Sequence, residues 1–170
     1  MLDTSAFIAG FDPLSVTDDV YSVPSVEREL ASNSVPWTRF RAATENGKLK
    51  LKTPNNLFLE RIKKSAKTVG DVLFLSDVDL EVLALALELK NLGHSPLIVT
   101  DDYSIQNVAA ELGVEFMSVG TFGIKRLLEW IRYCPACHSH YPANFPAQEC
   151  QICGTRLKRK PSKTLKNLRK

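Results

Sequence analysis

The fold class is decided by the stretch Pro96-Leu97-Ile98-Val99-Thr100-Asp101-Asp102. Its uninterrupted apolar run is typical of a strand that is buried on both faces, as in a parallel sheet. A helical segment from about 103 to 112 follows it, and a further strand is expected at 114–118. This alternation of strand and helix predicts an α/β fold with a parallel sheet flanked by helices. Functional groups of such sheets gather at the carboxyl ends of the strands, where Asp101 and Asp102 lie.

Three further acids stand at comparable places, each where a helix is expected to begin. Asp3 lies near the start of the sequence, Glu27 lies in the first turn of a short helix, and Asp79 precedes the strongly apolar segment 80–89. Taken singly, each has a simpler interpretation, because Asp is favoured as a helix cap and acids are stabilised in a first helical turn. The recurrence of the pattern favours a shared site instead.

Carboxylates that converge on one place repel each other unless cations compensate their charge. Oxygen ligands of this kind predict Mg²⁺ or Mn²⁺, with positions left open for water and phosphate. Such ions activate water and stabilise the charge that develops on a phosphodiester, so the pattern predicts a metal-dependent nuclease. The sequence has neither a glycine-rich phosphate loop nor a suggestive Ser/His/Asp order, which disfavours an NTPase or an acyl hydrolase.

The composition is that of a globular chain. It has 170 residues with 44% hydrophobic content, enough for one well-buried domain and a small appendage. No stretch approaches the roughly 20 apolar residues that cross a bilayer. Asp3 stands where a secretory signal would carry positive charge, so we expect a cytoplasmic protein with no membrane partner.

The net charge of +3 conceals an uneven distribution. Residues 156–170 hold eight of the 22 basic side chains and no acid. The rest of the chain therefore has fourteen basic and 19 acidic residues. The tail is therefore +8 and the body about −5. A basic tail is as compatible with a disordered solubilising end as with nucleic-acid binding. The residues are Arg156, Lys158, Arg159, Lys160, Lys163, Lys166, Arg169 and Lys170.

A second basic region is expected in the middle of the chain. Residues 33–53 alternate apolar with polar positions around Asn46-Gly47, which predicts a β-hairpin or an extended arm. A helix is expected from 53 to about 69. Together they predict a basic face with Trp37 and Phe40 nearby. On RNA, its Lys and Arg side chains would hold phosphates and an aromatic ring would stack on an unpaired base, the alternative being a solvated surface over two core aromatics. The basic residues are Arg39, Arg41, Lys48, Lys50, Lys52, Arg61, Lys63, Lys64 and Lys67.

The most specific spacing lies near the C-terminal end, where Cys134-Pro135-Ala136-Cys137 is separated by twelve residues from Cys150-Gln151-Ile152-Cys153. All four cysteines of the chain are here, and two disulfides are a poor alternative in a cytosolic protein. Four thiolates at this spacing predict a tetrahedral, structural Zn²⁺ site. His138 and His140 lie between the pairs and are expected at the surface or on RNA rather than as ligands. The amphipathic segment 121–132 is expected to form a linker helix.

The acids and their contexts resemble the four acidic motifs of PIN-domain ribonucleases, over residues 1 to about 120. The resemblance implies that Asp3, Glu27, Asp79 and Asp101 bind the catalytic metal, with Asp102 as an alternative to its neighbour. One departure is that only two residues precede Asp3, so the strand that holds it is expected to be very short. The motifs are Leu2-Asp3-Thr4-Ser5, Val23-Pro24 with Glu27, Leu75-Ser76 with Asp79, and Val99-Thr100-Asp101-Asp102.

A PIN domain followed by a four-cysteine ribbon and a basic tail is similar to the Nob family of endonucleases, which mature the 3′ end of small-subunit ribosomal RNA. The expected organisation is a nuclease domain at 1–120, the linker helix, a zinc ribbon at 133–157 and a disordered basic tail at 158–170. The resemblance implies cleavage of precursor small-subunit rRNA within a pre-ribosomal particle, by metal-activated water. Thr100 and Ser5 are expected to hydrogen-bond the acids.

Two alternatives stay open on the sequence alone. A non-catalytic RNA-binding assembly factor would keep the ribbon and the basic tail without metal-dependent cleavage. A toxin-like PIN ribonuclease would cut other, small RNAs, although such proteins generally lack the ribbon. The oligomeric state has no signature in the sequence.

Overall fold

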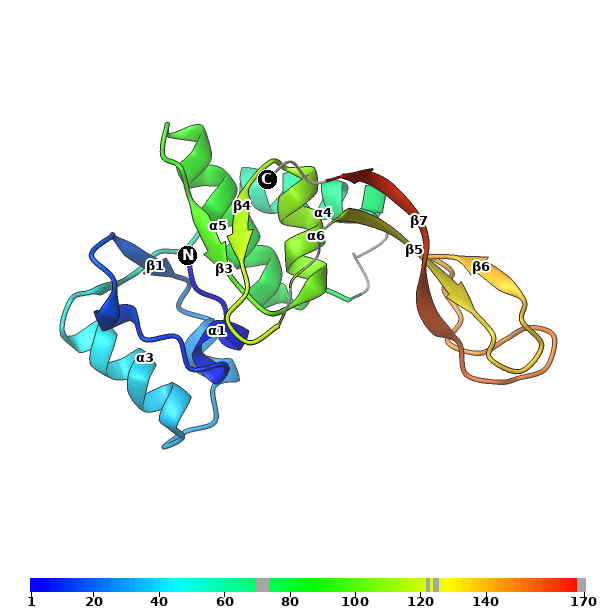
Figure 1. Cartoon of the computed structure of the whole chain (residues 1–170), viewed down its shortest axis with the longest axis horizontal. Helices are drawn as coiled ribbons and strands as arrows, with labels where there is room; N and C mark the ends of the chain where they lie inside the picture. The colour runs from blue at the N-terminus through cyan, green and yellow to red at the C-terminus, as the bar shows by residue number, and fades with distance from the viewer. Residues whose placement is uncertain (70–73, 122, 124–125, 168–170) are drawn as a thin grey trace.

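The structure is a computed structural model that describes residues 1–69, 74–121, 123 and 126–167 (Figure 1). An N-terminal α/β unit is followed by a long two-stranded stem that leads to the cysteine loops. The helices are α1 (Thr4–Ile8), η1 (Pro13–Ser15), α2 (Val26–Glu29), α3 (Val35–Glu45), α4 (Asn56–Val69), α5 (Asp77–Asn91) and α6 (Tyr103–Glu111). The strands are β1 (Val20–Ser22), β2 (Leu49–Leu51), β3 (Leu97–Val99), β4 (Glu115–Met117), β5 (Arg126–Tyr133), β6 (His140–Pro142) and β7 (Lys158–Asn167).

The sheet of the N-terminal unit is parallel, as expected. Met1 and Leu2 join its two strand pairs. β1 pairs with β2 and β3 pairs with β4, both in parallel. Between these pairs, Leu2 N donates to Tyr21 O at 2.9 Å, and Val99 N donates to Met1 O at 2.9 Å. Leu2 also forms a parallel bridge with Val99. The very short strand ahead of Asp3 is therefore held on both sides by backbone hydrogen bonds.

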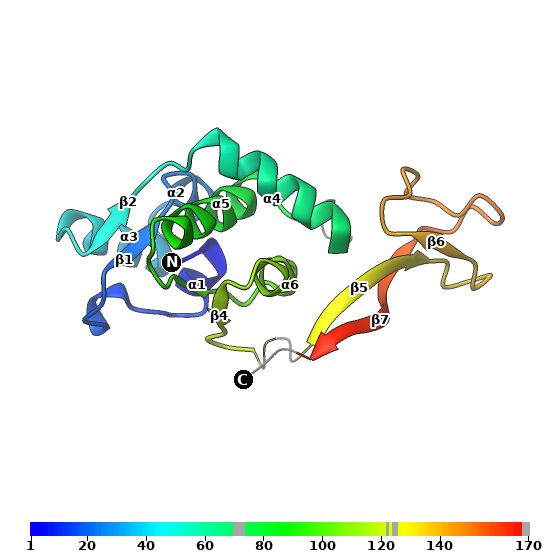
Figure 2. The same ribbon diagram turned by 90° about the horizontal axis from the view of Figure 1, so that it is seen from above.

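Helix α5 is the centre of the core, as its apolar sequence predicts. Ser76 caps it through a capping box with Asp79, and its side chains from Val82 to Ala86 are all fully buried. α4 and α6 both pack beside it (Figure 2). In the described part of the chain, no helix has the length and apolar character needed to cross a membrane.

The hairpin expected at 33–53 is wrong, because this region contains helix α3 followed by the short strand β2. Ser34 caps α3 by accepting from Trp37 N, and the helix begins with Pro36 in its first turn. Gly47 adopts φ 77° just beyond the helix, so Asn46-Gly47 ends a helix instead of turning a hairpin. Phe40 is fully buried against Phe7, with ring centroids 5.3 Å apart.

The linker helix and the disordered tail are also corrected, because the two segments pair with each other. Residues 126–133 form β5 and residues 158–167 form β7, in one antiparallel ladder from Tyr133 with Lys158 to Arg126 with Asn167. The apolar spacing of β5 also suits a helix, but its aromatic and branched residues, Trp130, Ile131 and Tyr133, favour a strand once a partner is present. Residues 122, 124–125 and 168–170 lie outside the described part of the chain.

Candidate active site

Asp3 is a buried carboxylate held by three donors. It caps α1 by accepting from Ala6 N at 2.8 Å, and only 2% of it is exposed. Ser5 Oγ donates to it at 2.8 Å and Thr100 Oγ1 donates at 2.6 Å. Burial raises the pKa of Asp3 above its usual value although these hydrogen bonds oppose the change, and the charge of Asp102 raises it further.

The same two hydroxyls tie Asp3 to the end of β3. Ser5 Oγ accepts from Asp101 N at 2.8 Å, and Thr100 Oγ1 accepts from Asp102 N at 3.0 Å. Each hydroxyl thus accepts from one backbone amide and donates to one carboxylate. The predicted contacts of Thr100 and Ser5 with the acids are confirmed.

Asp79 lies at the start of α5. Its Oδ2 accepts from Ser76 N at 2.8 Å, which completes the capping box. Burial raises the pKa of Asp79 to about 6, and the charges of Asp102 and Glu29 add to this effect. Asp79 is therefore close enough to Asp102 and Glu29 for like charges to repel, and a bound cation would relieve this repulsion.

The neighbours Asp101 and Asp102 have different surroundings. Asp101 accepts hydrogen bonds from the backbone of Val119, Gly120 and Thr121 at 2.9–3.2 Å, and so holds the loop after β4. Burial alone would raise the pKa of Asp101, but these hydrogen bonds outweigh it and lower the pKa. Asp102 caps α6 by accepting from Ser104 N at 2.6 Å, and its charge acts on both Asp3 and Asp79.

The structure makes a similar distinction between two acids of α2. Glu27 lies 3.3 Å from Arg41, in a surface ion pair. Glu29 is instead the acceptor for Thr4 Oγ1, next to Asp3, and for Ser76 Oγ at 3.3 Å, next to Asp79. Glu29 therefore belongs to the acidic group and was missed in the sequence. The only sequence signal for Glu29 was its position beside the apolar pair Val26 and Leu30, which is buried. Glu27 flanks the same pair, so this signal does not distinguish the two acids.

The structure thus brings together Asp3, Glu29, Asp79 and Asp102 at the starts of α1, α5 and α6, beside α2. None of the described lysines or arginines forms an ion pair with these carboxylates. Within the part of the chain that the structure describes, their oxygens do not converge as closely as the cysteine sulfurs do. Asp3 is anchored, whereas the other three are partly or well exposed, so their side chains can turn toward a cation.

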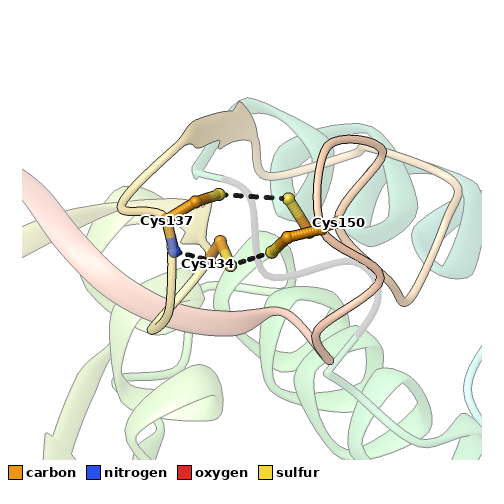
Figure 3. A group of neighbouring side chains, drawn as sticks. Cys134, Cys137 and Cys150 are labelled. Carbon is orange, nitrogen blue, oxygen red and sulfur yellow. Dashed lines mark hydrogen bonds between the residues drawn. The ribbon is translucent and has the colours of Figure 1, made fainter.

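The four cysteines form a second centre, in the loops at the far end of the stem (Figure 1). Figure 3 shows how Cys134, Cys137 and Cys150 lie within it. Their sulfur atoms all lie within 4.8 Å of one another, and the two nearest pairs are 3.4 Å apart, too far for a disulfide. Tyr141 Oη lies 3.1 Å from Cys150 Sγ and lowers the pKa of that thiol to about 6. This donor set suits tetrahedral zinc, while His138 and His140 are exposed and lie outside it.

At least four of the nine basic residues expected on the face around α3 and α4 form ion pairs with acids, Arg41 among them. Lys50 pairs with Asp19 at 2.8 Å, Lys52 with Glu88 at 3.3 Å and Lys63 with Glu60 at 3.0 Å. The expected base-stacking role of Phe40 is excluded because its ring is buried in the core, and Arg41 lies over the ring of Trp37. Phe40 is therefore a core aromatic, as the alternative interpretation of this face expects.

Comparison with known proteins gives two kinds of match. The family described as the PIN domain of ribonuclease matches residues 1–89. Endoribonuclease Nob1 of Methanocaldococcus jannaschii is 36% identical over 171 residues, which cover 100% of this chain and 82% of that protein. Endoribonuclease Nob1 of Methanothermobacter thermautotrophicus is 36% identical over 166 residues, which cover 94% of this chain and 91% of that protein.

A ribonuclease of a different name matches over a shorter length. Ribonuclease VapC1 of Thermoplasma acidophilum is 36% identical over 122 residues, which cover 72% of this chain and 59% of that protein. The Nob1 proteins thus match nearly the whole chain, and PIN nucleases are metal-dependent enzymes. The chain belongs to the Nob1 family of PIN-domain endoribonucleases.

Proposed function

We propose that this endoribonuclease cleaves precursor small-subunit rRNA near its 3′ end, within a pre-ribosomal particle in the cytoplasm. The observation that carries the proposal is the pairing of a PIN domain with a four-cysteine ribbon. Relatives named Endoribonuclease Nob1 match across both units. A toxin-like role is less well supported, because the match to VapC1 covers only 72% of this chain.

We further propose that Asp3, Asp79 and Asp102 hold a catalytic Mg²⁺ or Mn²⁺, with Glu29 as the fourth acid. Three of these carboxylates use one oxygen to cap a helix: Asp3 Oδ1, Asp79 Oδ2 and Asp102 Oδ1. Asp79 and Asp102 each have a second oxygen for a cation, and hard divalent ions prefer such oxygen ligands. Asp3 Oδ2 also accepts from Ser5 Oγ and Thr100 Oγ1, so Asp3 would bind the cation beside these hydrogen bonds. When bound, the ion supplies an activated water and stabilises charge on the phosphodiester.

In this proposal, the protein's own contribution is to hold the acids in place. Asp3 is buried and fixed by Thr100 and Ser5, so it serves as the rigid ligand. Asp79 and Asp102 approach from the ends of two separate helices, on the open side of the site. Glu29 accepts from hydroxyl groups beside both Asp3 and Asp79, which places it to orient a water or to complete the ligand set. We therefore assign the metal-binding roles that were expected for Glu27 and Asp101 to Glu29 and Asp102.

The cysteine centre has a structural role in this proposal. Zn²⁺ held by Cys134, Cys137, Cys150 and Cys153 has no open position, so it fixes the ribbon and carries no chemistry. Metal binding worth about 10–16 kcal/mol is enough to fold a module that is too small for its own core. The basic segment 158–167 then forms an ordered strand that can follow an RNA backbone.

The proposal is tested with RNA that spans the 3′ junction of the small-subunit rRNA. The zinc-loaded chain is incubated with Mn²⁺, the cut is mapped, and Asp3→Asn serves as the inactive control. A cut at the junction that needs both Mn²⁺ and Asp3 supports the proposal. Binding without any cut would indicate a non-catalytic assembly factor, and preferential cutting of small unrelated RNAs would indicate a toxin-like ribonuclease.

A further inference from the structure

One basic residue of the stem, Arg159 in β7, is packed against the N-terminal unit. Its guanidinium carbon lies 4.1 Å from the centroid of the Phe74 ring and 4.2 Å from that of Trp130. Trp130 belongs to the neighbouring strand β5, whereas Phe74 belongs to the segment that leads into α5. Arginine suits this position because its planar guanidinium stacks on aromatic rings and still donates hydrogen bonds at its edge.

Arg159 also touches the helix that begins at Asp102. Its Nη1 donates to Ser104 Oγ at 3.2 Å, and the backbone N of Ser104 donates to Asp102 Oδ1 at 2.6 Å. On the other side, Phe74 lies two residues before Ser76, whose backbone amide binds Asp79 Oδ2 at 2.8 Å. Arg159 is therefore in contact with the segment that leads to Asp79 and with the helix that Asp102 caps.

We propose that Arg159 is a positioning residue for the acidic metal site, through which the stem of the cysteine module holds the starts of α5 and α6 in register. The inference rests on the proposed function, because it concerns the acids assigned there to Mg²⁺ or Mn²⁺. Arg159 acts through Ser104 on Asp102 and through Phe74 on the segment before Asp79. It need not touch the RNA or the cation itself.

The surroundings of Arg159 differ from those of the adjacent basic residues. Arg159 is half-buried, while Lys158 on the same strand is exposed. Lys160 points to the stem itself, where its Nζ lies 4.8 Å from the centroid of the Tyr133 ring. Lys158→Gln is therefore a matched control, since it removes the same charge from the same strand without disturbing these contacts.

The test compares Arg159→Gln, Arg159→Lys and Lys158→Gln in the zinc-loaded full chain. Mn²⁺ binding is measured by calorimetry without RNA, and kcat and KM are measured on the junction RNA. We expect Arg159→Gln to weaken Mn²⁺ binding and to lower kcat by about tenfold each, as small misplacements of ligands do. KM should stay within about twofold of that of Lys158→Gln, and Arg159→Lys should recover only part of the loss because it restores charge without the planar stack.

A second variant separates positioning from folding. Ser104→Ala removes only the hydroxyl that Arg159 binds. It keeps the backbone amide that donates to Asp102. We expect it to weaken Mn²⁺ binding and lower kcat in the same direction, and the double variant to be no worse than Arg159→Gln alone. Zinc content and melting temperature show whether each variant is folded. If Arg159→Gln fails to fold, Ser104→Ala decides the question by itself.

Three outcomes would overturn the inference: equal behaviour of Arg159→Gln and Lys158→Gln, a loss confined to KM, or wild-type Mn²⁺ binding in Ser104→Ala. A wild-type chain that binds Mn²⁺ but cuts no RNA would instead overturn the proposed function. In that case, the Mn²⁺ affinities of the variants still report on Arg159.

Discussion

Thr100 Oγ1 donates to Asp3 Oδ2 at 2.6 Å, a contact between residues 97 positions apart in the sequence. Thr100 is fully buried, and its hydroxyl also accepts from Asp102 N. One hydroxyl therefore fixes the orientation of Asp3 relative to the chain that carries Asp102. This contact is formed where the first residues of the chain lie beside β3.

Thr100→Val should weaken the site without removing any acid. The substitution keeps the shape of the side chain but leaves Asp3 Oδ2 and Asp102 N without their shared partner. We expect roughly a 10–100-fold loss of metal affinity or of cleavage, the usual effect of a changed ligand partner. The free energy of unfolding should fall by about 1–3 kcal/mol, since buried polar atoms lose a hydrogen bond. Mn²⁺ titration and thermal melts measure the two effects, and unchanged Mn²⁺ affinity would contradict this role for Thr100.

The stability of the metal-free N-terminal unit should depend on the protonation of Asp79. Its pKa is raised to about 6 in the folded state, above the ordinary value near 4, so folding favours the protonated form. This contribution is fully present below pH about 4 and is lost as the pH rises through about 6. Melting temperatures of the wild type and Asp79→Asn, measured without Mn²⁺ from pH 4 to 8, should converge at the acid end. Parallel curves would show that Asp79 does not titrate in this range.

Mn²⁺ binding should have the opposite pH dependence to metal-free stability. A cation requires the ionised carboxylate, so binding releases the proton that Asp79 holds below its pKa. We expect affinity to fall by up to about tenfold per pH unit below about 6 for one released proton. Calorimetry in buffers of different ionisation enthalpy counts the protons released. A pH-independent affinity between 5 and 7 would exclude Asp79 as a ligand.

Two substitutions in α2 should have different effects. Glu29→Gln should lower Mn²⁺-dependent cleavage by at least about tenfold, because Glu29 faces Thr4 and Ser76 at the acidic site. Glu27→Gln loses only its surface ion pair with Arg41, which is worth about 0–1 kcal/mol of stability. Cleavage rates at saturating RNA distinguish the two. Equal rates in both variants, or the reverse order, would restore Glu27 to the site.

Asp101 and Asp102 should be separable in the same way. Asp102→Asn should lower Mn²⁺ affinity, because the charge of Asp102 acts on both Asp3 and Asp79. Asp101→Asn should mainly loosen the loop it holds, since its carboxylate accepts from the backbone of residues 119–121. Calorimetry reports the first effect and faster amide exchange at residues 119–121 reports the second. A larger loss of Mn²⁺ affinity in Asp101→Asn would reverse the assignment.

Loss of zinc should unfold the cysteine module and leave the N-terminal core folded. Cys137→Ser removes one of four sulfurs that lie within 4.8 Å of one another, so we expect less than one zinc per chain. Amide protection should disappear in residues 134–153 but persist in α5, whose side chains pack within the N-terminal unit. His140→Ala, a change at an exposed residue of β6, should keep both zinc and protection. Global unfolding of Cys137→Ser would show that the two units are not independent.

The parts of the fold that were predictable are those set by local pattern. Ile98 and Val99 of the apolar run and the apolar residues of helix α5 from Leu80 to Leu89 are buried as their sequences require, and the parallel sheet follows from the alternation of strand and helix. The cysteine spacing is equally local, because two short loops bring four sulfurs together whatever else surrounds them. Asp3 and Asp79 also lie at the predicted helix starts.

The pairing of strands could not be predicted in the same way. The spacing of apolar residues in 121–132 suits a helix as well as a strand, and only the approach of residues 158–167 selects the strand. Residues 158–167 are mostly basic and polar, so their sequence alone does not predict an ordered strand. Its order comes from a ladder with a segment more than twenty residues away.

The sequence by itself therefore determined the family, the parallel sheet, the cysteine centre and the presence of an acidic site. The choice of acids that we propose for that site depends on the tertiary structure. At about 100° per residue, Glu27 and Glu29 flank the buried pair Val26 and Leu30 by roughly 80° on opposite sides, so the helix alone cannot rank them. Asp101 and Asp102 are likewise adjacent at the end of one strand. In both pairs the choice depends on neighbours distant in sequence: Arg41 and Thr4 for the glutamates, and the loop after β4 for the aspartates.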